Sequence, residues 1–502
     1  MTDEEHPASD RPASTGAESG GERPFVWVTS TYFAQGYPYT IVNNLADILF
    51  KELGASLGVV GLTALFHLPW NLKFLWGPFV DQYETKRRWL IGVEVLLTVA
   101  LLLVALVASA GAWLVALATL FTILGFLAAT HDIAIDGFYL EALDEAGQSK
   151  LVGYRAMAFR MATMLLTGPG LVAIGWVGWS TGLMVLAACM GLITLLHVAV
   201  LPRHEPRREP ISALGRRLLS FRIFALGVVI AGLILLERRL AVLGRLVSAL
   251  TGAVPALGKI GLGGAIALAL LLVLLLLLPL RRVVAARMTS SESGYSQAFV
   301  SFLDQPKVGA ILAFVILFRT GESFLMKMKW PFFDDALHLP LEHYGFANGT
   351  LGLVASFSAT LLGGYLIGRH GLRRYIWPFV IAQNLLNLLY VGLAAGWFGA
   401  SPGLAAVTTV ITLERIGEGL GTAVFMVYLM RCCSPEHKAA HMAILTALMS
   451  LGFTLAGAVS GFIATRLGYA SYFFFSFCAT LPGMALIFVV PHLDHRHDAA
   501  SS

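Results

Sequence analysis

The stretch ATHDIAID, residues Ala129–Asp136, determines what kind of protein this chain is. It places His131, Asp132 and Asp136 inside a segment that is otherwise apolar enough to cross a bilayer. A charged side chain there costs about 2.5–3.5 kcal/mol on insertion scales. Asp132 and Asp136 are four positions apart, so they share one helix face and leave the other faces free to contact lipid. We therefore expect a membrane helix whose carboxylates face a protein interior or a water-filled path, as in a transporter.

The composition of the whole chain agrees with a membrane protein. Hydrophobic residues make up 57% and charged residues 13%, whereas about 25% of residues are charged in an average soluble domain. A span needs about 20 apolar residues, and such stretches fill most of residues 25–490. Twelve core spans and two weaker candidates can be counted. The sequence therefore predicts an all-α membrane protein with fourteen transmembrane helices.

The positive residues indicate how the chain is oriented. Lys and Arg cluster after the second, sixth, eighth and tenth core spans, as at Lys86, Arg87 and Arg88. The breaks at 108–112, 175–181 and 396–402 hold none. The positive-inside rule then predicts that both termini are cytosolic. It also accounts for the net charge of +5, so no nucleic-acid partner is implied.

Two six-helix halves are predicted from the order of the segments. The first 24 residues carry six acidic and two basic side chains, a composition that cannot bury enough apolar surface to fold alone. GPFVDQYETKRR (Gly77–Arg88) and GGYLIGRHGLRR (Gly363–Arg374) echo each other and support duplication. The mid-chain candidates, 221–236 and 263–280, either cross the membrane or form an interfacial hairpin. The expected divisions are a disordered acidic tail at 1–24, halves at 25–201 and 307–491, a linker at 202–306, and a tail at 492–502.

Several motifs carry a family resemblance. Gly77–Arg88 resembles the loop signature of the major facilitator superfamily between its second and third helices, with Asp81 in the acidic position. A larger set resembles the AmpG-type muropeptide permeases, which are related to the acetyl-CoA transporters of eukaryotic organelles. That set is YFAQGYP (Tyr32–Pro38), KFLWGPFVD (Lys73–Asp81), ATHDIAIDGFYLEAL (Ala129–Leu143), GYR (Gly153–Arg155) and GEGLGTAVFMVYLM (Gly417–Met430).

The resemblance implies a function that spacing alone does not give. It implies a location in the inner membrane, the major facilitator fold with two extra mid-chain helices, and proton-dependent import of anhydro-muropeptides. The chain departs from the family in its long acidic tail, in a basic loop between the extra helices, and in Gly368, where the repeated signature would carry an acid. These departures leave the exact cargo open between a muropeptide, an acyl-CoA, another peptide or sugar, and an exported compound.

Acidic residues within the spans are the candidate proton carriers, because low dielectric and nearby cations can couple protonation to conformation. A static ion pair with Arg155 or Arg160 is the alternative for the two aspartates. For the glutamates the alternatives are a cluster with Arg415 or a pair with Arg319. The candidates are Asp132, Asp136, Glu322, Glu414 and Glu418.

Uncharged polar and aromatic residues of the first two spans, together with Lys73, are the candidate substrate contacts. They are able to hydrogen-bond or stack against a sugar or peptide, although such residues also tie membrane helices together. Lys73 is placed either to meet a substrate carboxylate or phosphate or to neutralise Asp132. Asp47 is expected at a solvated helix end. The candidate substrate contacts are Tyr32, Gln35, Asn43, Asn44, Trp70, Asn71 and Lys73.

Charges near the cytosolic face are the candidate gate, since pairs that form in only one conformation bias a two-state equilibrium. Anchoring of the topology by the arginines is the alternative. The candidate gating residues are Asp81, Arg87, Arg88, Glu141, Arg155 and Arg160. No nucleophile elbow or phosphate-binding loop appears, so we expect no enzyme, metal or cofactor. An intramembrane transferase or a ligand sensor would be the rival classes. The expected partners are a muropeptide-like small molecule, protons and lipid, bound by a monomer.

Overall fold

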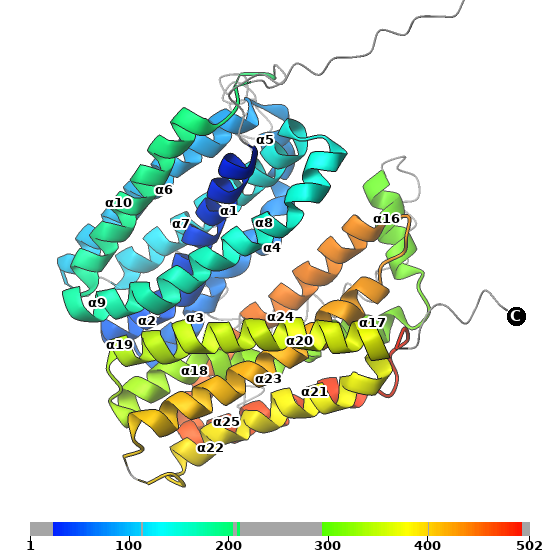
Figure 1. Cartoon of the computed structure of the whole chain (residues 1–502). Coiled ribbons are helices and arrows are strands. Elements are labelled where there is room, and N and C mark those ends of the chain that lie inside the picture. Colours follow the sequence, from blue (N-terminus) through cyan, green and yellow to red (C-terminus); the bar gives the residue numbers. More distant parts are fainter. Residues whose placement is uncertain (1–23, 112–113, 204–207, 211–293, 400, 494–502) are drawn as a thin grey trace, which may run out of the picture.

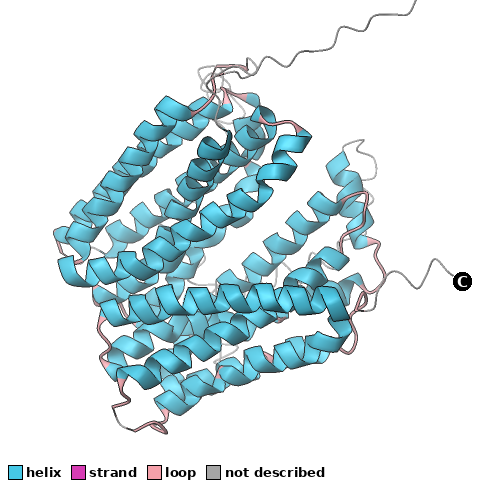
Figure 2. Ribbon diagram, viewed as in Figure 1, coloured by secondary structure: helices cyan, strands magenta, loops and turns pink. Residues whose placement is uncertain are grey.

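The computed structural model describes residues 24–111, 114–203, 208–210, 294–399 and 401–493. Two bundles of helices lie next to each other, the first built from the blue to green part of the chain and the second from the green to red part (Figure 1). The regular structure drawn in Figure 2 is helical. The predicted acidic tail, the two mid-chain hydrophobic helices and residues 494–502 lie outside the described residues.

Six helical rods build the first half, several of them from consecutive short helices. They are α1 (Pro24–Thr40) with η1 (Ile41–Leu45) and α2 (Ala46–Glu52); α3 (Leu57–Leu62) with η2 (Thr63–His67), α4 (Leu68–Leu72), η3 (Lys73–Leu75) and α5 (Gly77–Gln82); α6 (Lys86–Ser109); α7 (Leu114–Ala142); α8 (Glu145–Leu165) with η4 (Leu166–Gly170) and α9 (Leu171–Val177); and α10 (Trp179–Val200).

The second half repeats this plan after the helix α16 (Gly294–Leu303). Its six rods are α17 (Val308–Leu317) with α18 (Thr320–Leu337); α19 (Leu341–Tyr344) with η5 (Gly345–Gly352) and α20 (Leu353–His370); α21 (Leu372–Leu386) with α22 (Leu388–Ala394); α23 (Leu404–Arg431); α24 (Lys438–Leu467); and α25 (Tyr469–Cys478) with α26 (Leu481–Leu486). The predicted all-α fold with two six-helix halves is confirmed.

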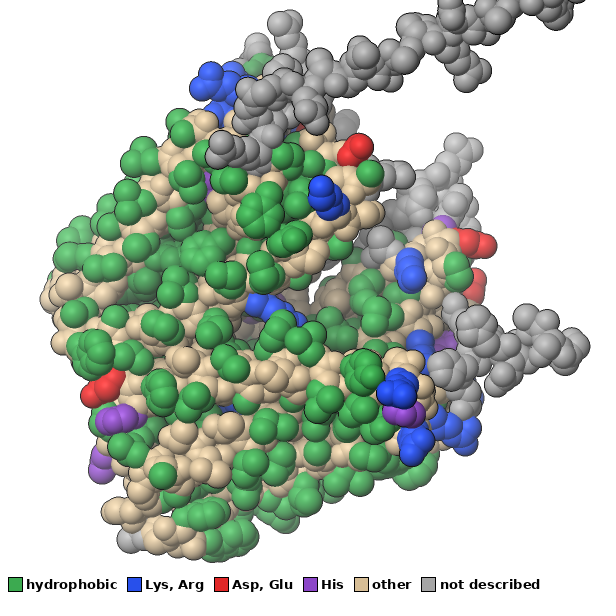
Figure 3. Space-filling view, viewed as in Figure 1, with side chains coloured by type: hydrophobic (Ala, Val, Ile, Leu, Met, Phe, Trp, Pro, Cys, Tyr) green, Lys and Arg blue, Asp and Glu red, His purple; other side chains and the backbone are tan. Residues whose placement is uncertain are grey.

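The sides of the bundles are suited to lipid. In the described part of the chain, nine helices are long and apolar enough to cross a membrane by length and composition. The rods α1–α2, α3–α5 and α23 are shorter, interrupted or more highly charged. Large apolar side chains such as Leu192, Leu195 and Leu361 point outward and are exposed. Figure 3 shows that hydrophobic side chains cover much of the visible sides of both bundles. The exposed apolar surface therefore indicates a bilayer as the surrounding solvent.

The two halves touch at one end, which we call the closed end. There α3 packs on α24, η4 on η5, and α9 on α19. One apolar core runs through both halves at this end and includes Phe50 and Phe333. Two further cores each belong to a single half, one around Phe138 and the other around Phe314. We call the opposite end, which carries the basic run 86–88 and its counterpart at 373–374, the basic end.

Two glycines allow this close approach of the halves. A Cβ at Gly349 would lie 1.7 Å from the backbone oxygen of Thr167, and one at Gly461 would lie 1.7 Å from that of Leu57. Neither distance leaves room for a methyl group without moving a backbone. The halves therefore meet through backbone contacts at the closed end.

Side-chain caps fix where two of the longer rods begin. The Thr85 hydroxyl accepts a hydrogen bond from the Arg88 amide (3.3 Å) at the start of α6. The Asp144 carboxylate accepts one from the Gly147 amide (2.8 Å) at the start of α8. Such caps satisfy amides that have no partner within the helix. The rod α6 carries Glu94 into the interior of the first half, and α8 carries Arg155 to Asp136 of α7.

Candidate functional site

A cavity lies between the halves and is lined by both. Its larger part has a volume of about 470 Å³ and its smaller part about 210 Å³. The two parts adjoin, because they share the lining residues Asn43, Asn44, Met326, Glu418 and Phe453. The space-filling view shows the molecule hollowed between the bundles (Figure 3). This location is where transporters built from repeated halves place their substrate and coupling-ion sites.

Aromatic rings and amides of the first half form an uncharged part of the cavity lining. The rings of His67 and Trp70 stack with centroids 5.3 Å apart and an interplanar angle of 10°. The Tyr39 ring meets Trp70 at 82° with centroids 5.3 Å apart. Asn43 and Asn71 add amide groups to the same lining. We call these five residues the aromatic–amide wall; its π faces and amides suit a sugar ring or a peptide backbone.

His67 joins this wall to the second half. Asn43 uses its Nδ2 to donate to the Tyr39 carbonyl (2.9 Å), so its Oδ1 faces the histidine ring. The Nδ1 of His67, 2.8 Å from that Oδ1, is then the donor. Its Nε2 lies 2.5 Å from the hydroxyl of Ser450 on α24. The imidazole thus bridges the two halves beside the cavity.

Asp132 on α7 pairs with the cation that also faces the cavity. The ammonium of Lys73 donates to one carboxylate oxygen of Asp132, and the amide of Gln35 donates to the other. Lys73 lines the cavity, whereas Asp132 and Gln35 are not among its lining residues. In this conformation Lys73 therefore contacts Asp132, as one of the two sequence alternatives predicted. It does so from a position that also lines the cavity, where the other alternative places a substrate anion.

Asp136 has separate partners. The Tyr32 hydroxyl donates to its carboxylate (2.8 Å), and so does the Arg155 guanidinium (3.2 Å). Arg155 also lies over the Tyr32 ring, 4.5 Å from its centroid. Arg160 is elsewhere, over the ring of Phe357 in the second half at 5.1 Å. The structure therefore gives Asp136 the predicted arginine pair, while Tyr32 and Gln35 bind carboxylates of α7.

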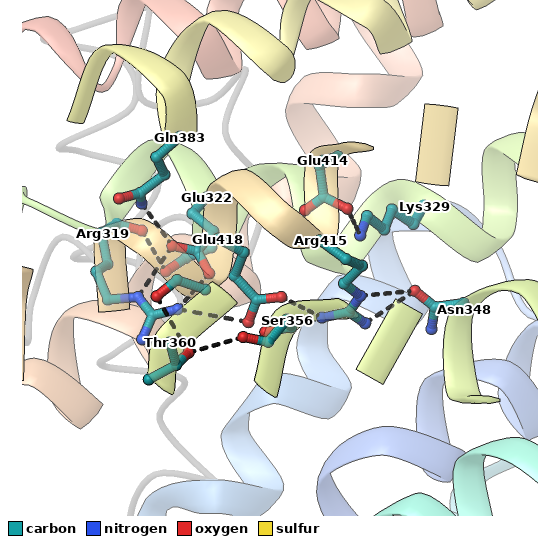
Figure 4. Close-up of polar contacts among 12 residues, drawn as sticks. Arg319, Glu322, Lys329, Asn348, Ser356, Thr360, Gln383, Glu414, Arg415 and Glu418 are labelled. Carbon is teal, nitrogen blue, oxygen red and sulfur yellow. Dashed lines mark hydrogen bonds and ion pairs between the residues drawn. The ribbon is translucent and has the colours of Figure 1, made fainter. Parts of the chain in front are cut away.

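The second half gives the cavity a charged wall (Figure 4). The Arg319 guanidinium donates to both carboxylate oxygens of Glu322, with Nε 2.9 Å from Oε2, and lies 3.7 Å from Glu418. Glu418 accepts from Arg415 at 2.6 Å. Arg319, Glu322 and Glu418 line the larger part of the cavity, and Arg415 lines the smaller part. We call these four residues the charged wall. Each of its carboxylates is paired with an arginine and also lines the cavity. The ion-pair interpretation and the cavity-facing interpretation from the sequence therefore both apply to it.

Glu414 lies one turn before Glu418 but in a different environment. It accepts from the Lys329 ammonium at 2.5 Å, and both side chains are 1% exposed. The Lys329 ammonium also lies 5.5 Å from the centroid of the Tyr390 ring. Glu414 and Lys329 are not among the cavity-lining residues. This pair therefore resembles an internal support for α18 and α23 more than a water-facing proton carrier.

Ion pairs cross between the halves at the closed end. Asp47 on α2 lies 3.3 Å from the ammonium of Lys327 on α18, and the side chains are 15% and 7% exposed. One turn along α2, Lys51 lies 2.5 Å from Asp335 and 3.1 Å from Asp334. The prediction of a solvated helix end for Asp47 is therefore wrong: the packing of α2 on α18 covers its carboxylate and supplies a cation. Along α2 the acidic Asp47 comes before the basic Lys51, whereas along α18 the basic Lys327 comes before the acidic Asp334 and Asp335. Each contact therefore joins opposite charges.

At the basic end, the predicted gating residues contact groups of the first half and its following loop. Asp81 accepts from the Lys86 ammonium, and Glu141 accepts from Arg208. Arg88 donates to Glu84 at 2.8 Å. Arg87 donates to the backbone oxygen of Val198 at 2.9 Å. A latch between halves at this end remains a prediction for another conformation.

Comparison with known families gives two matches that together cover both halves. The model described as Major Facilitator Superfamily matches residues 310–502, and the model described as Acetyl-coenzyme A transporter 1 matches residues 25–161. The second half of the chain is therefore similar to the major facilitator superfamily, and the first half to the acetyl-coenzyme A transporters. Solved structures agree on the fold: a peptide transporter POT in complex with sulfate aligns with a TM-score of 0.64 at 13% identity, covering 95% of this chain and 96% of the other. The nucleoside transporter NupG aligns with a TM-score of 0.57 at 13% identity, covering 93% and 99%.

Relatives within the superfamily point to the AmpG group. The anhydromuropeptide permease of Escherichia coli K12 is 23% identical over 91% of this chain and 77% of its own length. The putative transporter AmpG 4 of Rickettsia conorii is 21% identical over 90% and 92%. An uncharacterized protein of Haemophilus influenzae is 24% identical over 94% and 95%. The protein is therefore a multi-pass membrane transporter that resembles the AmpG-type permeases.

Sequence reasoning missed several polar residues of this transporter. Lys327 and Lys329 lie within the apolar rod that contains α18. Charged residues in such a segment are rare, so their position alone could have marked them as candidates. Glu94 was also missed: its carboxylate oxygen Oε1 lies 2.6 Å from Nδ1 of His197 and 3.1 Å from Nε2 of His131. All three side chains are fully buried within the first half. His131 is thus a hydrogen-bonded core side chain in this structure.

Proposed function

We propose that this transporter imports anhydro-muropeptides, or closely similar sugar-peptides, across the inner membrane together with protons. One observation carries the proposal: the cavity between the halves has the aromatic–amide wall on one side, with Lys73 beside it, and the charged wall on the other. A molecule that joins a sugar to a charged peptide has matching parts. The name of the Escherichia coli relative, anhydromuropeptide permease, supports the same cargo.

The proposed orientation in the membrane follows from the charge bias of the loops. Because Lys and Arg are enriched on the cytosolic side, the basic end faces the cytosol and the closed end faces the periplasm. Both termini are then cytosolic. The closed end is where the halves touch and where Asp47 pairs with Lys327. The structure is accordingly an inward-facing conformation, from which cargo is released.

The transport cycle is alternating access by a monomer. In the outward-facing state, substrate enters between the halves and a carboxyl group that is paired with a cavity-lining cation takes up a proton. The halves then rock about the cavity, the pairs between α2 and α18 form, and substrate and proton leave at the basic end. Asp132 and Glu322 are the proposed proton carriers, because each is paired with a cation that lines the cavity.

Uptake into proteoliposomes tests this function. Purified full-length protein is reconstituted, and a labelled anhydro-muropeptide is added outside under an inward proton gradient. Accumulation above equilibrium that collapses with a protonophore is the expected result. Uptake that ignores the gradient would contradict proton coupling, and no uptake of the intact molecule would contradict the cargo.

A carrier of acyl-CoA is the second candidate function. The match of residues 25–161 to the model named Acetyl-coenzyme A transporter 1 favours it. The same proteoliposomes distinguish the two cargoes by competition. Excess unlabelled acetyl-CoA should leave muropeptide uptake unchanged, whereas unlabelled muropeptide should abolish it. The reverse order of inhibition would favour the acyl-CoA carrier.

A further inference from the structure

Lys73 stands between a carboxylate behind it and the cavity in front of it. Its ammonium pairs with Asp132, yet the lysine side chain is 38% exposed and lines the cavity. The Asp132 side chain is only 12% exposed. An ammonium with one face toward a buried carboxylate and the other toward the substrate space has access to two different anions.

The Asp132 carboxylate has one cationic partner and one neutral partner. Its two oxygens accept from Lys73 and from the neutral amide of Gln35. Its neighbour Asp136 is held by Tyr32 and Arg155 instead. Lys73 is therefore the cation that neutralises Asp132 among the ion pairs of the described residues. Whatever removes the charge of Asp132 leaves Lys73 as an unpaired cation facing the cavity.

We propose that Asp132 and a carboxylate of the substrate bind Lys73 alternately, and that uptake of a proton by Asp132 makes the exchange. This inference rests on the proposed function and deepens it. The neutral acid form of Asp132 no longer pairs with the ammonium. A substrate carboxylate takes its place and restores neutrality beside the cavity. Proton and carboxylate then enter the transporter as a pair, and net charge in the site stays the same.

The cooperation between proton and substrate follows from the energy of unpaired charge. A substrate carboxylate that arrives while Asp132 is ionised meets a second negative charge and a lysine already neutralised. A proton that arrives without a carboxylate leaves a lone ammonium at low dielectric. Both intermediate states are unfavourable. Each ligand therefore raises the affinity for the other by the same factor, as linkage requires.

Other charged and titratable groups near Lys73 have partners of their own. His67 on η2 bonds to Asn43 and Ser450. Tyr39 on α1 packs against His67. Across the cavity Arg319 is paired with Glu322, and Glu418 is paired with Arg415. With Asp136 held as described, the exchange is confined to Lys73, Asp132 and the incoming anion.

Binding measured by calorimetry tests the exchange on purified protein in lipid nanodiscs. The probes are an anhydro-muropeptide with free peptide carboxylates and the same molecule with every carboxylate converted to an amide. For the wild type, the Kd of the carboxylate probe should rise about tenfold per pH unit as pH increases, which is the slope for one proton taken up. Titrations in buffers of different ionisation enthalpy should show that proton directly. The amide probe should bind with neither effect.

Matched variants separate the exchange from a structural role. Asp132→Asn should bind the carboxylate probe without proton uptake and without the pH slope. Lys73→Met should lose the preference for the carboxylate probe, whereas Lys73→Arg should keep it. Asp304→Asn and Lys150→Met, both exposed outside the cavity lining, should behave as the wild type. Binding of the amide probe by every variant reports an intact cavity.

Two results would overturn the inference while leaving the proposed function in place. One is proton uptake by Asp132→Asn equal to that of the wild type. The other is an undiminished carboxylate preference in Lys73→Met. Failure of the wild type to bind either probe would instead overturn the proposed cargo, and the exchange with it.

Discussion

Replacing Lys327 by methionine should open the closed end of the transporter. Lys327 on α18 is the cation that faces Asp47 on α2, at 3.3 Å. The contact joins the two halves where both also line the smaller part of the cavity. In a conformation open at this end, water would reach both side chains. The variant therefore destabilises the closed conformation specifically, since only there is the Asp47 carboxylate largely buried without a cation.

The size of the effect follows from distance and burial. Two unit charges 3.3 Å apart attract by about 5 kcal/mol at an effective dielectric of 20. Desolvation cancels much of this attraction, while loss of one partner of a fully buried pair costs about 3–5 kcal/mol. Because the two side chains keep 7% and 15% exposure and line the cavity, the pair is not fully buried, and we take about 2 kcal/mol for the variant. A free energy of that size changes the ratio of conformations about 30-fold, since each 1.4 kcal/mol is tenfold.

Distances between spin labels measure this ratio. Labels at Thr181 and Ser401 would report the separation of the halves at the closed end, in a background without the native cysteines. The four to replace are Cys189, Cys432, Cys433 and Cys478. We expect the short-distance population of the wild type to move to a longer distance in Lys327→Met. The exposed Lys150→Met is the matched control and should leave the distribution unchanged.

A double variant sharpens the test. Asp47→Asn combined with Lys327→Met leaves no unpaired charge, so its distribution should return toward that of the wild type. The reasoning would be refuted if Lys327→Met changed the ratio less than twofold, or if the double variant opened the closed end further than the single one.

Three other predictions follow from the structure. Lys329→Met should lower the free energy of unfolding by about 3–5 kcal/mol, because it strands the buried carboxylate of Glu414; adding Glu414→Leu should restore much of the loss in thermal unfolding, and no recovery would contradict a charge effect. Gly349→Ala should separate the halves at the closed end, because its Cβ would meet a backbone oxygen at 1.7 Å; unchanged cross-linking across that end would count against it. Partial desolvation, together with the charge of Asp334, raises the pKa of the exposed Glu52 carboxyl at the end of α2. Its protonated form thus stabilises the fold at low pH, and this contribution is lost as pH rises through the raised pKa; Glu52→Gln should therefore raise Tm at about pH 8 but not at about pH 3, and equal effects at both would refute the assignment.

The sequence carries local information about this fold and much less about its contacts. The spacing of Asp132 and Asp136 in an apolar segment predicted that both carboxylates face the protein interior, and each does have protein partners. Which cation each one takes is decided by how α7 packs on η3 and α8. Spacing along one helix cannot supply that information.

Contacts between the halves could not be predicted from the sequence, because they depend on how distant helices pack together. Lys51 and Asp335 are 284 positions apart, and their pairing depends on how α2 and α18 dock. Asp47 was assigned to solvent because a carboxylate near the end of a span usually reaches water. Its partner Lys327 lies on another rod, so no local pattern linked the two. The AmpG resemblance, in contrast, was readable, since short motifs of adjacent residues carry it.

Three wide π-turns border the region between the halves: η4 and η5 pack on each other, and η1 contributes Asn43 and Asn44 to the cavity lining. A π-turn holds one more residue than the α-helix around it. If the surplus residue passes along the rod, the segment beyond rotates by about 100°, the angle per residue of a helix with 3.6 residues per turn. The amides Asn43 and Asn44 of η1 and Asn348 of η5 lie in such turns. These joints therefore give the protein a means to swing amides that line the cavity by rewinding a helix, with no loop exposed to the hydrocarbon.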